Sequence, residues 1–129
     1  MLRLPSPFAL TIALAASFLL PGCGGGDVDT VALRTQLSGV ADALDRCVGK
    51  TNDARKCATA QALGDLPDGT ELGSAPGQIR IQANRALRYE LVAEVGDDVQ
   101  FSVLAAPVGA RKRYCLPAGR GDCPNSGAW

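Results

Sequence analysis

The sequence predicts an α+β domain in which one amphipathic helix packs on an antiparallel sheet. Three observations support this: apolar residues recur at helical spacing over 29–48, they alternate with polar residues between 78 and 105, and four cysteines form two close pairs. The chain has 129 residues, of which 47% are hydrophobic and 20% are charged. Such a chain suits one small domain, which we place at 29–129, with its sheet spanning about residues 78–116.

The expected helix presents a single apolar stripe, formed by Leu33, Leu37, Val40, Leu44 and Cys47. Either Asp29 or Thr30 can cap its start, and Gly49 can end it. Two heptads are too short to argue for a coiled coil, so we expect this stripe to lie on a sheet. The polar stretch 50–56 is predicted to be a loop, 58–63 to add a helical turn and 64–77 to be irregular.

Beyond residue 78 the apolar residues repeat with a period of two, as strands with one buried face require. The alternating runs cover 79–83, 87–95 and 99–105. The first buried position of the second run is Leu87, and Ser102 falls among the polar positions of the third. A short hairpin at Gly96-Asp97-Asp98 joins these two runs. We therefore predict an antiparallel meander of three or four strands.

The composition excludes several common kinds of chemistry. The chain contains no histidine, which removes histidine-based triads, histidine metal ligands and histidine pH switches. No Gly-x-Ser-x-Gly sequence and no phosphate-binding loop is present. We accordingly expect no enzymatic activity, no cofactor and no metal. The formal net charge of zero also gives no reason to expect a polyelectrolyte partner for the whole chain.

The chain has five cysteines, at positions 23, 47, 57, 115 and 123, and an odd number in an exported protein needs an explanation. If Cys23 is modified, the other four can pair in three ways. The spacings favour Cys47–Cys57 and Cys115–Cys123, because each pair brackets a short polar loop. A four-cysteine zinc site or a redox pair is the alternative, although no Cys-x-x-Cys spacing occurs.

Residues 1–22 have the features of an export segment. Arg3 precedes an apolar stretch from Phe8 to Leu20, which as a helix would cover about 20 Å of the roughly 30 Å hydrocarbon core. A secretory signal fits this length better than a permanent membrane span. The sequence that follows, Leu20-Pro21-Gly22-Cys23, resembles the lipobox of bacterial lipoproteins, with an untypical proline.

The lipobox resemblance implies that the chain is cut before Cys23 and that this cysteine carries diacylglyceryl and palmitate-type acyl groups. The lipid bilayer would then be a partner, and 23–28 would be a Gly-rich linker. Gly24, in place of the aspartate that signals inner-membrane retention, favours the outer membrane in that family. The alternatives are a secreted protein whose Cys23 forms a disulfide and an uncleaved inner-membrane anchor.

The order of the expected elements, together with the C-terminal sequence, resembles the globular domain of type IV pilins. The run YELVAEVGDDVQFSVLAAPVG at 89–109, followed by Cys115, Cys123 and a final Trp129, is similar to the end of minor pilins. The resemblance implies a pilin-like fold over 29–129 and a bridge after the helix at Cys47–Cys57. It also implies envelope proteins as partners, in pilus or secretion machinery. The chain departs from pilins in lacking a prepilin leader and its apolar half-helix, whose place the lipid takes.

The densest run of charge is Arg111-Lys112-Arg113. As a possible ligand-binding site it would offer a small phosphate footprint for DNA, and a solvated strand edge explains the same residues. The neutral net charge favours the edge, so we do not expect nucleic acid as a partner, although its binding is testable. Trp129 is expected to dock on the sheet. Overall the sequence predicts a non-catalytic structural or interaction module of the cell envelope.

Overall fold

The computed structural model describes residues 28–96 and 98–129. The predicted signal peptide 1–22, the lipidation site Cys23 and the linker as far as Asp27 lie outside the described residues, as does Asp97. The described part contains the helices α1 (Thr30–Thr51), η1 (Ala54–Cys57, a 3₁₀ helix) and α2 (Ala60–Leu63), followed by the strands β1 (Ile79–Arg85), β2 (Arg88–Val95), β3 (Val99–Ala105) and β4 (Arg111–Leu116).

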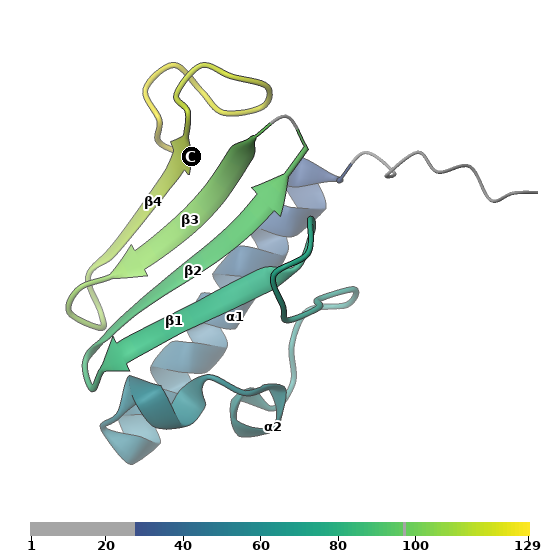
Figure 1. The fold of residues 1–129 in the computed structure, drawn as a ribbon. Helices are drawn as coiled ribbons and strands as arrows, with labels where there is room; N and C mark the ends of the chain where they lie inside the picture. The colour runs from purple at the N-terminus through teal and green to yellow at the C-terminus, as the bar shows by residue number, and fades with distance from the viewer. Residues whose placement is uncertain (1–27, 97) are drawn as a thin grey trace, which may run out of the picture.

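The strands form one antiparallel sheet in the order β1-β2-β3-β4, and α1 crosses one of its faces (Figure 1). The predicted α+β class, with a helix packed on an antiparallel meander, is confirmed. Helix and sheet make two layers with the core between them. That core contains Leu37 and Leu44 from α1, which are fully buried, and Leu91 and Phe101 from the sheet, which are fully buried as well.

The two ends of α1 have distinct caps. Asp29 caps the first turn, because its Oδ1 accepts a hydrogen bond from the backbone N–H of Ala32 (3.0 Å). The helix does not end at Gly49, as expected from the sequence, but continues to Thr51. Asn52 then adopts a left-handed conformation (φ 54°), and its N–H donates to the carbonyl of Val48 (2.7 Å). Asparagine tolerates this conformation, so it provides the C-cap that we had expected from glycine.

Two expectations about the strands are wrong. Leu87 does not belong to a buried face, since it lies in the β1–β2 turn with 53% of its surface exposed. Ser102 faces away from α1, as its polar position predicts, yet it is fully buried. The register explains this, because Ser102 lies between Val92 on β2 and Tyr114 on β4, whose larger side chains cover it.

Both expected disulfides are present, and their pairing is confirmed. Cys47–Cys57 joins α1 to η1 with a Cα–Cα distance of 5.9 Å, and Cys115–Cys123 closes the loop after β4 with 5.7 Å. This C-terminal loop packs on the start of α1, where the hydroxyl of Thr30 donates to Asp122 (2.8 Å) and the guanidinium of Arg34 donates to the carbonyl of Asp122 (2.8 Å).

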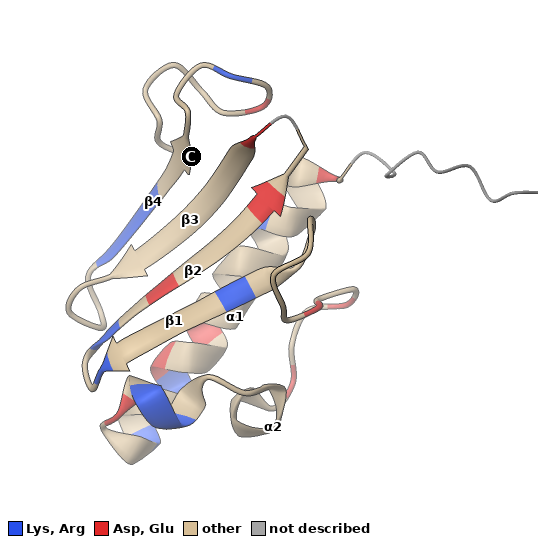
Figure 2. Ribbon diagram, in the orientation of Figure 1, with Lys and Arg blue, Asp and Glu red and all other residues tan. Residues whose placement is uncertain are grey.

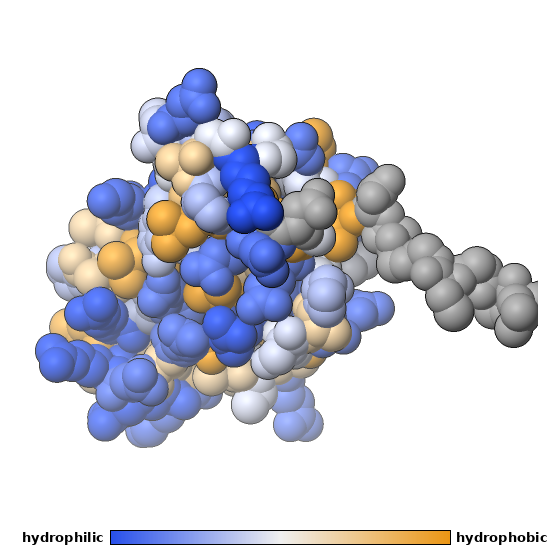
Figure 3. All heavy atoms as spheres, turned by 45° about the horizontal axis from the view of Figure 1, so that its top comes forward, coloured by the Kyte–Doolittle hydropathy of each residue, from blue (hydrophilic) through white to orange (hydrophobic). Residues whose placement is uncertain are grey.

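Large hydrophobic side chains are exposed singly rather than in patches. Val31 and Leu116 lie at the end of the molecule where α1 begins, and Leu87 lies at the other end. The face drawn in Figure 3 shows hydrophobic residues scattered among hydrophilic ones. In the part of the chain that is described, no helix combines the length and the apolar character needed to cross a membrane.

Candidate interaction site

The predicted basic run lies on β4, and the strand geometry separates its side chains. Successive residues of a strand point to opposite faces, so Arg111 and Arg113 lie on the side of α1 and Lys112 lies on the opposite face. Arg111 is held by two carboxylates of α1: its Nη2 donates to Asp42 (2.8 Å) and its Nε donates to Asp45 (3.1 Å). The run therefore does not form one contiguous basic surface.

The ion pairs of Arg111 belong to a network that fixes the helix to the sheet. The hydroxyl of Tyr89, a residue that is 1% exposed, donates to Asp45 (2.7 Å) and to the carbonyl of Ala41 (3.3 Å). Burial and then the hydrogen bond to Asp45 raise the pKa of Tyr89 above the ordinary range of tyrosine. Burial opposes the charge of Arg111, but its hydrogen bonds to Asp45 and Asp42 outweigh this and raise its pKa. These contacts give Arg111 a structural role.

Arg113 is engaged with the last residue of the chain. Its guanidinium carbon lies 5.5 Å from the ring centroid of Trp129, at a distance typical of a cation–π contact. The indole N–H of Trp129 donates to the carbonyl of Tyr114 (2.8 Å), and its ring meets Phe101 edge to face at 5.9 Å. The C-terminal aromatic is thus docked on the sheet, as expected. Binding through Arg111, Lys112 and Arg113 stays a prediction.

Basic residues gather instead at the end of the domain where α1 ends (Figure 2). The backbone N–H of Ala54 in η1 donates to the carbonyl of Ala86 in the β1–β2 turn (2.7 Å), which brings these two basic segments together. We call this surface the basic end. It comprises Arg46 and Lys50 on α1, Arg55 and Lys56 on η1, and Arg85 and Arg88 at the β1–β2 turn.

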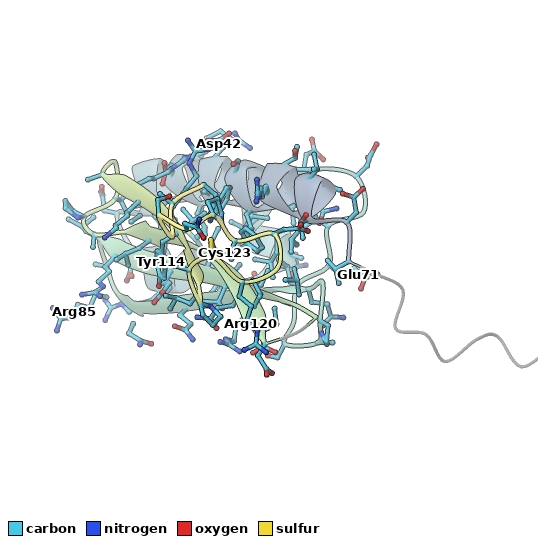
Figure 4. All side chains as sticks on the ribbon, turned by 90° about the horizontal axis from the view of Figure 1, so that it is seen from above. Asp42, Glu71, Arg85, Tyr114, Arg120 and Cys123 are labelled. Carbon is cyan, nitrogen blue, oxygen red and sulfur yellow. A yellow bond between two sulfur atoms is a disulfide. The ribbon has the colours of Figure 1, made fainter. Side chains whose placement is uncertain are left out.

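Most acidic residues lie elsewhere on the domain, although Asp53 lies beside η1, and Asp42 and Asp45 lie on α1 (Figure 2). Four lie at the end where α1 begins: Asp29, Glu94, Asp98 and Asp122. Three more lie on the connection between α2 and β1: Asp65, Asp68 and Glu71. Figure 4 shows Arg85 and Glu71 on opposite sides of the molecule. The formal net charge of zero therefore conceals an uneven distribution of charge, with an excess of cations at the end where α1 ends.

A groove opens beside the basic end, between the second half of α1 and the segment η1–α2. It has a volume of about 260 Å³. Buried apolar residues form its floor, namely Ala43, Cys47 and Leu63. Its other lining residues are Arg46, Lys50, Thr51, Lys56 and Ala62, all of which are exposed. A groove with an apolar floor and a cationic rim can accept a group that is both apolar and negatively charged.

Sequence reasoning missed this groove because its residues come from two separate segments. Arg46 lies on the predicted helix, but Lys50 falls beyond its predicted end at Gly49, so no signal in the sequence indicated that the two share one side. Lys56 also fell in a stretch interpreted as a solvated loop. Its position opposite α1 depends on η1, whose existence the sequence did not predict.

The described residues hold no group of three or more His, Cys, Asp or Glu side chains placed to bind a metal ion.

On the face of the sheet opposite α1, the hydroxyl of Tyr114 donates to Glu90. Burial and this hydrogen bond raise the pKa of Tyr114.

Comparison with known proteins adds no relative: no protein-family model, no curated protein and no solved structure matches the chain. The sequence and the geometry of the site therefore carry the functional argument.

Proposed function

We propose that this protein is an exported, membrane-anchored lipoprotein whose domain is a non-catalytic structural or interaction module of the cell envelope. The observation that carries the proposal is the sequence Leu20-Pro21-Gly22-Cys23 directly after a short apolar stretch. The two disulfides support it, because such bonds persist in oxidising compartments outside the cytoplasm. The outer membrane is the favoured destination, on the basis of Gly24.

The lengths of the linker and of α1 set how far each end of such a domain could lie from the membrane. Five residues separate Cys23 from Asp29, so even a fully extended linker reaches no more than about 22 Å between these two residues. The 22 residues of α1 span about 33 Å, with Thr30 at the end nearer the anchor. With the start of α1 held by this short linker, the basic end would be the part of the domain that can extend farthest from the membrane.

A pilin-like plan is part of the same proposal. A single long helix on a four-stranded meander, followed by a disulfide-closed C-terminal segment, supports a likeness to the globular domain of type IV pilins. The lipid would replace the apolar half-helix by which pilins enter a fibre. We accordingly propose a role beside pilus or secretion machinery rather than within a fibre. Cross-linking in intact cells that captures no component of such machinery would remove this part of the proposal.

Intact mass spectrometry of the membrane-extracted protein, with and without reduction, tests the anchor. We expect a mature chain that begins at Cys23, carries acyl mass and gains four hydrogens on reduction of its two disulfides. As a control, Cys23→Ser should abolish acylation, so that no acyl mass is found on the chain. An unacylated wild-type chain, or a dimer that separates on reduction at Cys23, would refute the lipoprotein proposal.

A further inference from the structure

We propose that the groove between α1 and α2 binds an acidic segment of a partner protein, with an apolar side chain of that segment on the groove floor. This inference rests on the proposed function, because it names the class of partner that the interaction module would recognise. The site is formed by Arg46, Lys50 and Lys56 around the floor residues Ala43, Cys47 and Leu63.

The cations of the groove are free to meet an external carboxylate. Among the described residues, Arg46, Lys50 and Lys56 take part in no ion pair, whereas Arg55 is paired with Asp53 (2.9 Å) and Arg111 with Asp42 (2.8 Å). Lys50 also complements the negative end of the α1 dipole, which is reason enough for a basic residue in the last turn. That reason does not extend to Lys56, which comes from η1 on the opposite side of the groove.

The shape of the groove favours a protein segment over other anions. Its volume of about 260 Å³ is below the usual range for small-molecule sites, and it suits one or two side chains. Duplex DNA presents its phosphates on a convex surface, without a side chain that projects between them onto the floor residues Ala43 and Leu63. A bilayer surface is flat on this scale and does not enter a concave site. In a peptide, acidic side chains can pair with the cations of the rim while an apolar side chain packs on the floor.

One wall of the groove depends on a disulfide. Cys47–Cys57 fastens η1 to α1, and the hydroxyl of Thr51 accepts a hydrogen bond from the N–H of Asp53 (3.2 Å) at the same junction. Lys56 precedes the bridged Cys57 directly, so its distance from Arg46 is set by the bridge. Reduction should therefore loosen the wall and weaken binding, which gives the site a dependence on the oxidised chain.

The test uses the mature protein, extracted in neutral detergent, and a panel of fluorescent peptides of about 15 residues. Each peptide carries a central Leu, Phe or Trp flanked by glutamates, and fluorescence anisotropy gives the dissociation constant. We expect at least one peptide to bind, and its affinity to fall about tenfold or more when glutamine replaces its glutamates or serine replaces its central residue.

Variants of the protein locate the site. The triple variant Arg46→Gln, Lys50→Gln, Lys56→Gln should weaken binding about tenfold or more, since three exposed ion pairs are lost. Lys112→Gln with Arg120→Gln removes two exposed cations outside the groove and should leave the affinity unchanged. Ala62→Phe narrows the groove without changing its charge, and it should also weaken binding. Circular dichroism and the disulfide content show that each variant is folded.

Three results would overturn the inference: no binding by any peptide, equal binding by the glutamine peptides, or unchanged affinity in the triple variant. Tighter binding to a short duplex than to any peptide would assign the groove to nucleic acid instead. Binding to anionic vesicles by the Cys23→Ser protein, abolished in the triple variant, would assign it to lipid headgroups. The acyl mass on Cys23 is measured independently, so failure of the anchor and failure of the groove are distinguishable.

Discussion

Gly39 lies in the middle of α1, where alanine is ordinarily the better residue by about 0.5–1 kcal/mol. In this domain the opposite result is expected. A Cβ built at position 39 would lie 2.2 Å from Cγ and 2.9 Å from Cδ of Pro67, which crosses the helix on the way to β1. Carbon atoms pack at about 3.5–4 Å, so Pro67 would have to retreat by more than about 1 Å.

Overpacking of this kind costs about 1–3 kcal/mol, which exceeds the gain in helix propensity. We expect Gly39→Ala to lower the free energy of unfolding by about 1–2 kcal/mol, measured by urea denaturation followed by circular dichroism. The matched control is Gly49→Ala in the same helix, where a Cβ would meet no atom within 4 Å. This substitution should raise the free energy of unfolding by about 0.5 kcal/mol. Pro67→Ala should partly rescue Gly39→Ala. A Gly39→Ala protein more stable than wild type would show that Pro67 is not seated on the helix.

Three further results are expected. The chain has two tyrosines, and burial followed by a carboxylate hydrogen bond raises the pKa of both Tyr89 and Tyr114, so tyrosinate absorbance should rise only above about pH 10. Their contribution to the free energy of unfolding is complete below the pKa of tyrosine in the unfolded chain, and it is lost as the pH rises through the higher pKa of the folded chain. Tyr89→Phe should therefore make the free energy of unfolding fall less steeply at alkaline pH. An unchanged dependence of stability on pH would contradict this. Replacing Cys47 and Cys57 by alanine should lower the free energy of unfolding by about 2.5 kcal/mol, and equal denaturation midpoints would exclude an effect of the bridge. Short duplexes at two salt concentrations should show little salt-sensitive binding to Arg111–Arg113, and a steep salt dependence lost in Lys112→Gln would establish that run as a DNA site.

The fold class could be predicted from the sequence because the apolar periodicity changes once along the chain. The helical stripe and the alternating runs each describe one buried face, and two such faces pack on one another. The disulfide pairing followed from spacing because both loops are short. The details that failed, such as the end of α1 and the exposure of Leu87, are set by one or two residues at the boundary of an element, where periodicity carries little information.

The residues of the candidate site were harder to predict because strand geometry and tertiary contacts redistribute charge. In the sequence, Arg111, Lys112 and Arg113 form the strongest basic signal, yet a strand sends neighbours to opposite faces and α1 supplies carboxylates for Arg111. Arg46, Lys50 and Lys56 have no prominent signal and come together through η1 and its bridge. A local count of charge thus identified Arg111 and Arg113, which make contacts within the domain, and missed the three cations that line the groove.

The distance between the groove cations and the proposed anchor affects which partners these cations could meet. The groove residues Ala43 and Lys50 lie 13 and 20 residues beyond Thr30, which places them about 20–30 Å along α1 from the anchored end. The surface potential of an anionic bilayer decays within a Debye length of about 8 Å at physiological ionic strength. With the domain extended from its linker, the anchoring membrane would therefore compete little for these cations. A lipid on Cys23, near the start of α1, would thus leave the basic end available to the proposed partners, whereas an anchor at the other end of the helix would not.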